Sequence, residues 1–319
     1  MSARNEARRR RRVLRLLRTA LVCLIALAVA LLFSIVPYRS FLSAAQIAAR
    51  GEGEVRLHFL SVGQGDCTIV EFPGGDVLVV DAGDGSFEAN NAIVSYVKGL
   101  NVRSLSLLAT HADIDHYGGF SELLRVFQAD KFYLPVLSSP TSAYQGLLAA
   151  IAREGCETQT LTRYDVIGDA SGAYVVCISP HGVDETDSNA ASTMLYMSYA
   201  GVNILLSADA DAAREKSILS ELQLAEDILD SGIYRVRPDE THILKVAHHG
   251  AAGSSDADWL AFLSPEAAIV SCGAGNGYHH PAGEAMARLA GLGTQIYRTD
   301  ELGNIMLTVR GGSYTITYA

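Results

Sequence analysis

One short stretch of the sequence brings several candidate metal ligands together. An apolar run that ends at Ala109 is followed directly by His111, Asp113, Asp115 and His116. Imidazole and carboxylate groups suit zinc, manganese or iron. The paired glycines Gly118 and Gly119 come next, and they permit a tight turn with close approach of the backbone to an ion. The stretch predicts a metal site at a strand end, with an Asp- and His-rich surface turn as the alternative.

Two further apolar runs end in side chains of the same kinds. Asp209 follows the run Asn203–Leu206, and His248 and His249 follow the run His242–Ala247. Carboxylates and imidazoles are hard or borderline ligands. Because candidate ligands follow three separate predicted strands, one shared metal centre is favoured over a chance surface turn.

Short strands and helices must position these side chains. Apolar runs predict strands at Val55–Leu60, Thr68–Phe72, Val77–Val80, Leu105–Ala109, Tyr174–Ser179, Thr193–Tyr199, Asn203–Leu206, His242–Ala247, Ala267–Val270 and Ile305–Val309. Helical periodicity predicts helices at Glu88–Gly99, Phe120–Phe127, Ser142–Glu154, Ala212–Leu224, Asp256–Leu263 and Gly283–Leu292. No linker rich in proline, glycine or serine divides this region. The pattern predicts two sheets that lie between helical layers, whereas composition alone supports either an α/β or an α+β chain.

The N-terminal segment differs in composition from the rest. Arginines crowd positions 4–18, and an uncharged apolar run follows from Thr19 to Val36. This run is close to the length that crosses a hydrocarbon core of roughly 30 Å. Positive charge before it predicts a cytoplasmic N-terminus and an extracytoplasmic C-terminal domain. We therefore expect a basic segment, one transmembrane helix and a short linker in residues 1–50, and the functional domain in residues 51–319. A signal peptide cleaved near Ser43-Ala44-Ala45 is the alternative.

The overall charge limits the kinds of partner. The chain of 319 residues carries a formal charge of −10, and the N-terminal arginines leave the remainder more acidic still. This balance argues against a diffusely basic nucleic-acid-binding surface, although it leaves a local groove open. The five cysteines form no Cys-x-x-Cys pair, which predicts unpaired thiols. The phosphate-cradling Gly-x-x-x-x-Gly-Lys motif is absent from the sequence, which argues against a nucleotide-driven motor.

Together these motifs make the sequence resemble the metallo-β-lactamase superfamily, and most closely the C-terminal hydrolase domain of ComEC-type competence proteins. The similarity covers nearly everything from Val55 to the C-terminus. The segments that carry it are Val62–Asp66, Val80–Gly83, Thr110–Gly119, Asn189 with Ser192, Leu206–Asp209, His248–Gly250, Asn276–Pro281 and Arg298–Asp300. The resemblance implies an αββα sandwich that binds two divalent metal ions, zinc or manganese.

The family pattern also implies roles for individual residues. Its metal ligands fall on His111, Asp113, Asp115, His116, Asp209 and His249. The first two serve one ion, the next two serve the other, and Asp209 bridges both ions. Either His248 or His249 completes the second site; we assign His249 as the ligand and His248 as a contact to the phosphate or leaving group. Asp115, Asp209 and His248 are the candidate catalytic residues.

Two departures from the wider superfamily matter. The usual signature is His-x-His-x-Asp-His, and Asp113 stands where its second histidine lies. The ComEC-type group shares this change. The wider superfamily also supplies a histidine from a later Gly-His turn; here His181 is the candidate, with an ordinary loop histidine as the alternative. An oxygen-rich first site favours a harder ion such as manganese.

Other polar residues are candidates for substrate contact or for support of the ligands. They are Gln64, Asp66, Asp81, Asn189, Ser192, Asn276, Tyr278 and His280. Asp81 ends a strand and is expected to orient the metal loop through hydrogen bonds. Gln64 and Asp66 either line the site or shape a glycine-flanked turn. The last three lie in a glycine-rich loop, a typical place for substrate contacts.

Several functions are compatible with this pattern. The expected reaction is hydrolysis by a metal-activated water. Because the resemblance implies nuclease or phosphodiesterase chemistry, the expected substrate is a phosphodiester, with DNA as one candidate. A cell-surface phosphorylcholine esterase-like enzyme, a lactonase or another ester hydrolase are alternatives of the same fold. A non-catalytic scaffold with a decayed site is the alternative outside the enzymes, and retention of the candidate ligands argues against it.

Overall fold

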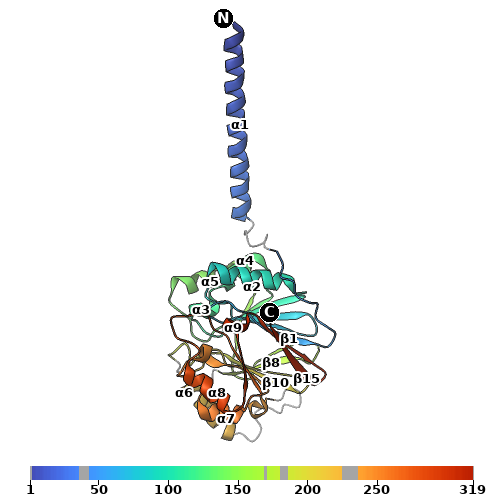
Figure 1. Cartoon of the computed structure of the whole chain (residues 1–319), viewed down its shortest axis with the longest axis vertical. Coiled ribbons are helices and arrows are strands. Elements are labelled where there is room, and N and C mark those ends of the chain that lie inside the picture. Colours follow the sequence, from blue (N-terminus) through green and yellow to red (C-terminus); the bar gives the residue numbers. More distant parts are fainter. Residues whose placement is uncertain (1, 36–42, 169–170, 180–185, 225–235, 319) are drawn as a thin grey trace. The chain divides into compact units, whose positions relative to one another are not determined.

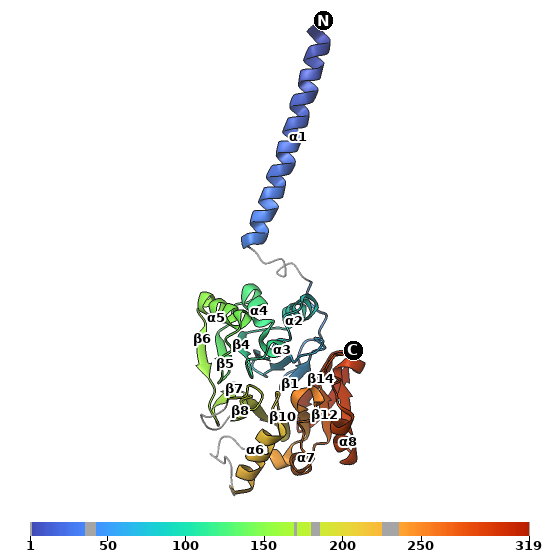
Figure 2. The ribbon, with the colours of Figure 1, turned by 90° about the vertical axis from the view of Figure 1, so that its left-hand side faces the viewer.

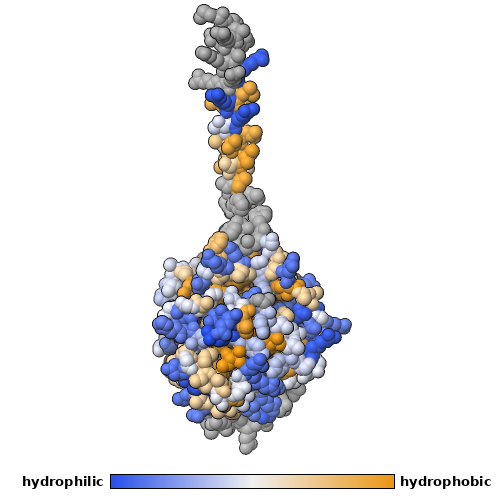
Figure 3. Space-filling view, in the orientation of Figure 1, coloured by the Kyte–Doolittle hydropathy of each residue, from blue (hydrophilic) through white to orange (hydrophobic). Residues whose placement is uncertain are grey.

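The computed structural model describes residues 2–35, 43–168, 171–179, 186–224 and 236–318. Its contacts divide the chain into two units, Met1–Leu42 and Ser43–Ala319. In the first unit, helix α1 (Ser2–Ile35) exposes apolar side chains between Val13 and Val29, which form a hydrophobic band in Figure 3. Among the described residues, none of the helices combines the length and the apolar character that crossing a membrane requires.

The second unit is built on two sheets. The first sheet has the strand order β15-β14-β1-β2-β3-β4-β5-β6. Its strands are β1 (Val55–Phe59), β2 (Thr68–Glu71), β3 (Asp76–Val80), β4 (Ser104–Leu108), β5 (Lys131–Leu134), β6 (Glu157–Thr160), β14 (Ile305–Arg310) and β15 (Ser313–Tyr318). Pairing is antiparallel from β15 to β3 and parallel from β3 to β6.

The second sheet has the strand order β13-β12-β11-β10-β9-β8-β7. Its strands are β7 (Val166–Gly168), β8 (Tyr174–Ser179), β9 (Met194–Tyr199), β10 (Val202–Leu206), β11 (Ile243–Lys245), β12 (Ala267–Val270) and β13 (Gln295–Arg298). Strands β10, β11, β12 and β13 run parallel to one another, whereas β7, β8, β9 and β10 pair antiparallel. The C-terminal ends of the parallel strands therefore meet at one edge of each sheet.

Helices cover the outer faces of both sheets (Figures 1 and 2). Those beside the first sheet are α2 (Phe87–Gly99), α3 (Ile114–Tyr117), α4 (Phe120–Val126) and α5 (Ser142–Glu154). Those beside the second sheet are α6 (Ala212–Leu224), α7 (Ala257–Leu263) and α8 (Gly283–Gly291). Shorter elements are α9 (Thr299–Leu302) and the 3₁₀ helices η2 (Pro238–Glu240) and η3 (Ala247–Gly250). This is the predicted arrangement of two sheets between helical layers.

Strand side chains that point alternately to the two faces of a sheet explain how the sheets pack against each other and against the helices. On β1, Val55, Leu57 and Phe59 are buried in the core between the sheets, where Ile204 and Ile269 of the second sheet also lie. A separate buried cluster joins the outer face of the second sheet to its helices and includes the fully buried Trp259 of α7. Because successive strand residues point to opposite faces, a single strand of the second sheet contributes side chains both to the core between the sheets and to the cluster under the helices.

Residues 43–50 pack with the second unit, so that unit begins before the boundary at Gly51 expected from the sequence. Ala45 N donates to Ser95 O at 2.8 Å, and Ser95 Oγ donates to Ser43 O at 2.6 Å. Arg56 of β1 donates to Ala48 O at 2.7 Å. The segment is thereby fastened to α2 and β1.

Glu215 of α6 supports the start of α7. Its two carboxylate oxygens accept hydrogen bonds from Ser255 N at 3.0 Å and from Asp256 N at 2.7 Å. The residue is almost fully buried. Burial raises the pKa of the Glu215 carboxyl to about 8, although the two backbone donors act in the opposite direction. The folded protein therefore retains a proton that the unfolded chain has already lost near neutral pH.

This shift predicts a stability that depends on pH. Between an unfolded pKa of roughly 4.3 and the folded pKa of about 8, the folded state binds more protons, so stability should fall as pH rises. The urea midpoint of the full chain should decrease from pH 5 to pH 8, and Glu215→Gln should remove part of that decrease. Glu284→Gln, at an exposed position of α8, is the matched control. An unchanged pH dependence in Glu215→Gln would contradict the assignment.

Candidate metal centre

The candidate ligands come from three strand-end segments of the two sheets. The first segment follows β4 and contains His111 and His116, both buried. Asp209 follows β10, and the turn of η3 after β11 carries His249. The glycine pair after the first segment is required, because a Cβ on Gly119 would collide with the carbonyl oxygen of Ala82. The fold thus gathers the three predicted strand ends at one place.

Each buried imidazole is held by its Nδ1 atom. His116 Nδ1 lies 2.8 Å from Asp81 Oδ2, and His249 Nδ1 lies 3.0 Å from the carbonyl oxygen of Ser271. His111 Nδ1 lies 3.0 Å from Thr110 Oγ1. These contacts leave all three Nε2 atoms free to face the interior, the arrangement in which an outer partner fixes the tautomer of a metal-binding histidine.

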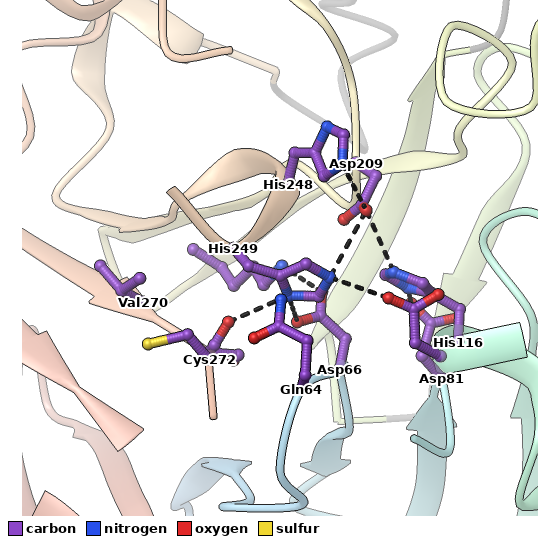
Figure 4. Close-up of polar contacts among 12 residues, drawn as sticks. Gln64, Asp66, Asp81, His116, Asp209, His248, His249, Val270 and Cys272 are labelled. Atoms are coloured by element: carbon purple, nitrogen blue, oxygen red, sulfur yellow. Dashed lines mark hydrogen bonds and ion pairs between the residues drawn. The ribbon is translucent and has the colours of Figure 1, made fainter. Parts of the chain in front are cut away.

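The Nε2 atoms converge on one carboxylate oxygen, Asp209 Oδ2. Its distances are 3.3 Å to His116, 3.5 Å to His249, 3.7 Å to His248 and 4.0 Å to His111. Figure 4 shows three of these imidazoles directed at Asp209. This central position fits the expected bridging role.

These atoms fit a dinuclear metal site. The Nε2 atoms of His111, His116 and His249, and Asp209 Oδ1, are buried without a hydrogen-bond partner among the described residues. Buried polar atoms normally have partners, so a cation accounts for their state. Potential ligand atoms lie within 4.8 Å of one another in several groups, two of which are His111–His116–Asp209 and Asp115–His116–His249. A borderline ion such as zinc or a harder one such as manganese suits this mixture of nitrogen and oxygen.

The imidazoles and carboxylates of the cluster shift one another's pKa values. Burial lowers the pKa of His111 to about 3, and the neighbouring His116 acts in the same direction. Burial also opposes a charged His249, but Asp209 and Asp66 outweigh it and raise the pKa of His249 to about 10. Burial opposes ionisation of Asp209 as well, yet the imidazoles hold the pKa of Asp209 well below its usual range. A cation that binds here therefore displaces a proton from His249.

Asp81 has the supporting position expected of it. Its carboxylate accepts hydrogen bonds from Thr110 N and Thr110 Oγ1, both at 2.8 Å, besides its contact to His116. Asp81 itself adopts a left-handed backbone conformation with φ of 59°. The carboxylate thus orients both ends of the first ligand segment.

Asp113 lies further out than the sequence pattern implied. Its Oδ2 is 3.8 Å from His111 Nε2, and its side chain is 45% exposed. It belongs to none of the ligand groups found among the described residues. His111 instead groups with His116 and Asp209, so the structure does not bring the expected pair of first-site ligands, His111 and Asp113, into one such group.

The two candidate histidines of η3 differ clearly. His249 is buried and its Nε2 lies 3.3 Å from Asp115 Oδ2, whereas the side chain of His248 is 31% exposed. Both adopt left-handed backbone conformations, with φ of 53° and 50°. This geometry favours His249 as the ligand and leaves His248 partly exposed to solvent.

Gln64 and the pair Asn189 and Ser192 support neighbouring loops. Gln64 Oε1 accepts a hydrogen bond from Gly273 N at 3.1 Å, so its side chain ties two loops together. Ser192 N donates to Asn189 O at 3.0 Å in the segment that precedes β9. Ser192 Oγ is buried without a partner among the described residues. His181, the candidate extra ligand, lies outside the described residues.

Asp66 forms a buried ion pair that sequence reasoning missed. Its Oδ2 pairs with Lys245 Nζ, and its Oδ1 lies 3.3 Å from His249 Nδ1. The side chains of Asp66 and Lys245 are 4% and 2% exposed. Burial disfavours the charged carboxyl, but Lys245 and His249 hold the pKa of Asp66 below its usual range. The sequence feature that indicates this pair is Lys245, a charged residue inside the apolar run of β11, which needs a buried partner.

The comparisons with known proteins agree with this geometry. Residues 60–155 match the family model of the metallo-beta-lactamase superfamily. This stretch contains the first ligand segment, and the match agrees with the resemblance that the motifs indicated.

The chain is also similar to ComEC-type competence proteins. It is 27% identical over 272 residues to "ComE operon protein 3" of Bacillus subtilis (strain 168), which covers 80% of this chain and 33% of that protein. It is 26% identical over 287 residues to "Competence protein ComA" of Neisseria gonorrhoeae, covering 89% and 36%. For "Recombination protein 2" of Haemophilus influenzae, identity is 24% over 249 residues, with coverage of 77% and 28%. The chain spans about a third of the length of these curated relatives.

One solved structure supports the fold. The crystal structure of CmlA, a diiron β-hydroxylase from Streptomyces venezuelae, matches with a TM-score of 0.51 and 14% sequence identity. The match covers 82% of this chain and 55% of CmlA. At this identity the likeness concerns the fold alone.

The buried ion pair predicts a specific pattern of stability. Lys245→Met should leave the Asp66 carboxylate buried without its cation, which costs about 3–5 kcal/mol in the free energy of unfolding. The double variant Lys245→Met with Asp66→Asn removes both charges and should recover much of that loss. Urea unfolding of the full chain, with metal content measured by mass spectrometry, checks both effects. Equal losses in the single and double variants would show that Lys245 acts through packing and not through Asp66.

Proposed function

We propose that this chain is a metal-dependent hydrolase that cleaves phosphodiesters. The observation that carries the proposal is the convergence of four imidazole Nε2 atoms, within 4.0 Å, on one oxygen of Asp209. The superfamily match supports metal-dependent hydrolysis. The names of the relatives, which refer to competence and recombination, support a nucleic-acid phosphodiester such as DNA.

The residues that would hold two divalent ions are His111, His116, His249, Asp115 and Asp209, with Asp113 at the rim. When bound, such ions act as Lewis acids that lower the pKa of an attacking water and offset charge on the phosphate oxygens. Asp115, whose side chain is 29% exposed, accepts a hydrogen bond from that water and orients it. His248, which is partly exposed beside Asp209, donates a proton to the leaving oxygen.

The test combines metal content with turnover. The full chain, purified without chelator and loaded with zinc or manganese, should contain close to two ions and should hydrolyse bis-p-nitrophenyl phosphate and single-stranded DNA. Chelator should remove the activity. Asp209→Ala should lower kcat/KM by more than about a hundredfold, because loss of a central ligand exceeds the usual ten- to hundredfold cost of losing an outer partner.

Asp258→Ala is the matched control, because Asp258 is an exposed carboxylate on α7. Its metal content and turnover should equal those of the unaltered chain. Full activity in Asp209→Ala would refute the mechanism. Stoichiometric metal without phosphodiester cleavage would redirect the proposal to another ester, and a chain that binds no metal would indicate a scaffold.

We also propose that α1 attaches the chain to a cell membrane, with the sandwich outside the cytoplasm. The exposed apolar side chains of α1 and the arginines that precede them support this proposal. The full chain should sediment with membranes and resist alkaline extraction. Replacing Leu21 and Leu24 by arginine should release it, whereas replacing both by alanine should not. Soluble behaviour of the unaltered chain would contradict the attachment.

A further inference from the structure

The loop between β12 and α8 lies beside the metal-ligand cluster. Because β11 and β12 are parallel neighbours, the segments that follow them leave the sheet at the same edge. Two hydrogen bonds hold the loop against η3. His249 Nδ1 lies 3.0 Å from Ser271 O at the start of the loop, and Ala282 N donates to Gly250 O at 2.8 Å at its end.

Asn276 fixes the conformation of the loop tip. Its Oδ1 accepts hydrogen bonds from Tyr278 N and His280 N, both at 3.1 Å. Its Nδ2 donates to Gly273 O at 2.8 Å and to His280 O at 2.5 Å. A side-chain amide that bonds four backbone groups holds a turn in one conformation. The side chains at the tip are therefore presented without much further ordering.

Three rings form a column that leads from the ligand cluster to the surface. The ring of His280 lies nearly parallel to that of His249, with 6.3 Å between centroids and 26° between planes. Tyr278 stacks on His280 in turn, at 5.9 Å and 29°. His248 meets the edge of the same column, since its ring centroid is 5.6 Å from that of His280.

The outer ring of this column is open to solvent. Tyr278 is 71% exposed, although a large aromatic side chain gains by burial. One of its faces contacts His280, and its high exposure leaves area for a further planar group. Only the ring of His280 lies between Tyr278 and the candidate ligand His249 in this column. A preorganised, exposed aromatic ring at this place is suited to contact the group attached to the reacting phosphate.

We propose that Tyr278 is a specificity-determining residue that stacks on a nucleobase of the phosphodiester substrate. This inference rests on the proposed function. A phosphate held at the cluster near His248 places its attached nucleoside along the ring column, and stacking on Tyr278 stabilises any base because every base has a planar face. The residue therefore selects nucleotide substrates over phosphodiesters without rings, without reading the sequence of bases.

The rings of the column favour a flat ring over a choline cation. Recognition of quaternary ammonium groups uses aromatic cages, but the rings that follow Tyr278 in the column are the imidazoles of His280 and His249. A nucleobase stacks on a single exposed aromatic face, which Tyr278 offers.

The test compares substrates that differ only in their bases. Single-stranded oligothymidylate and an oligomer of the same length made of abasic residues, each with a fluorescent label at the far end, are cleaved by the full, metal-loaded chain. The unaltered chain should prefer oligothymidylate. Tyr278→Ala should raise KM for oligothymidylate by about tenfold to a hundredfold and leave KM for the abasic oligomer unchanged. Tyr278→Phe should behave as the unaltered chain, and Tyr278→Leu as Tyr278→Ala.

The matched control is His279→Asn. His279 is exposed on the same loop with φ of 59°, a conformation that asparagine tolerates. Its KM values should not change. Equal changes for both oligomers in Tyr278→Ala, or equal behaviour of the Leu and Phe variants, would overturn the stacking role.

Binding separates this inference from the proposed function. If the unaltered chain cleaves neither oligomer, the phosphodiesterase proposal fails, and the affinities of the two oligomers are then measured by fluorescence anisotropy. A preference for oligothymidylate that disappears in Tyr278→Ala would still support stacking by Tyr278. Equal affinity for both oligomers, or stronger binding of choline phosphate than of thymidine 5′-monophosphate, would reject it.

Discussion

The buried carboxylate of Asp209, with four imidazoles around it, is the interaction on which the rest of the sandwich depends. A buried carboxylate surrounded by imidazoles is costly to desolvate, so every charge near it needs a defined partner. The structure supplies these partners in layers: Asp81 behind His116, the Ser271 carbonyl behind His249, and Lys245 beside Asp66. Removing a partner from any layer would leave charge buried at the junction of the two sheets.

The same constraint explains where the backbone is strained. Asp81, Ala208, His248 and His249 all have positive φ, between 47° and 59°, a region that costs non-glycine residues of order 1–3 kcal/mol each. All four lie at strand ends next to the cluster. Straight continuation of the strands would carry the ligands past one another, so the turns that bring them together use conformations which the surrounding hydrogen bonds must maintain.

Much of this site follows from the sequence because its ligands sit directly after apolar runs. Apolar runs predicted β8 and β12 with the observed bounds, and helical periodicity predicted α5 with the observed bounds. Strand β6, Glu-Thr-Gln-Thr, was missed because it lies at a sheet edge and has no apolar run. Strands β13 and β15 are also edge strands with partly exposed residues. The pairing of Asp66 with Lys245 could not be predicted, because it depends on which loops of the two sheets meet.

The docked segment Ser43–Arg50 limits when a peptidase could cut the chain near Ala45. A peptidase binds its substrate as an extended strand with free backbone groups, but here the backbone of Ala45 is paired with Ser95. Gly99 at the end of α2 lets this segment come close, since a Cβ there would collide with the Ala45 carbonyl oxygen. Cleavage near Ala45 would therefore have to occur before the segment docks. Once the segment is docked, the Ala45 amide is no longer free to pair with a peptidase.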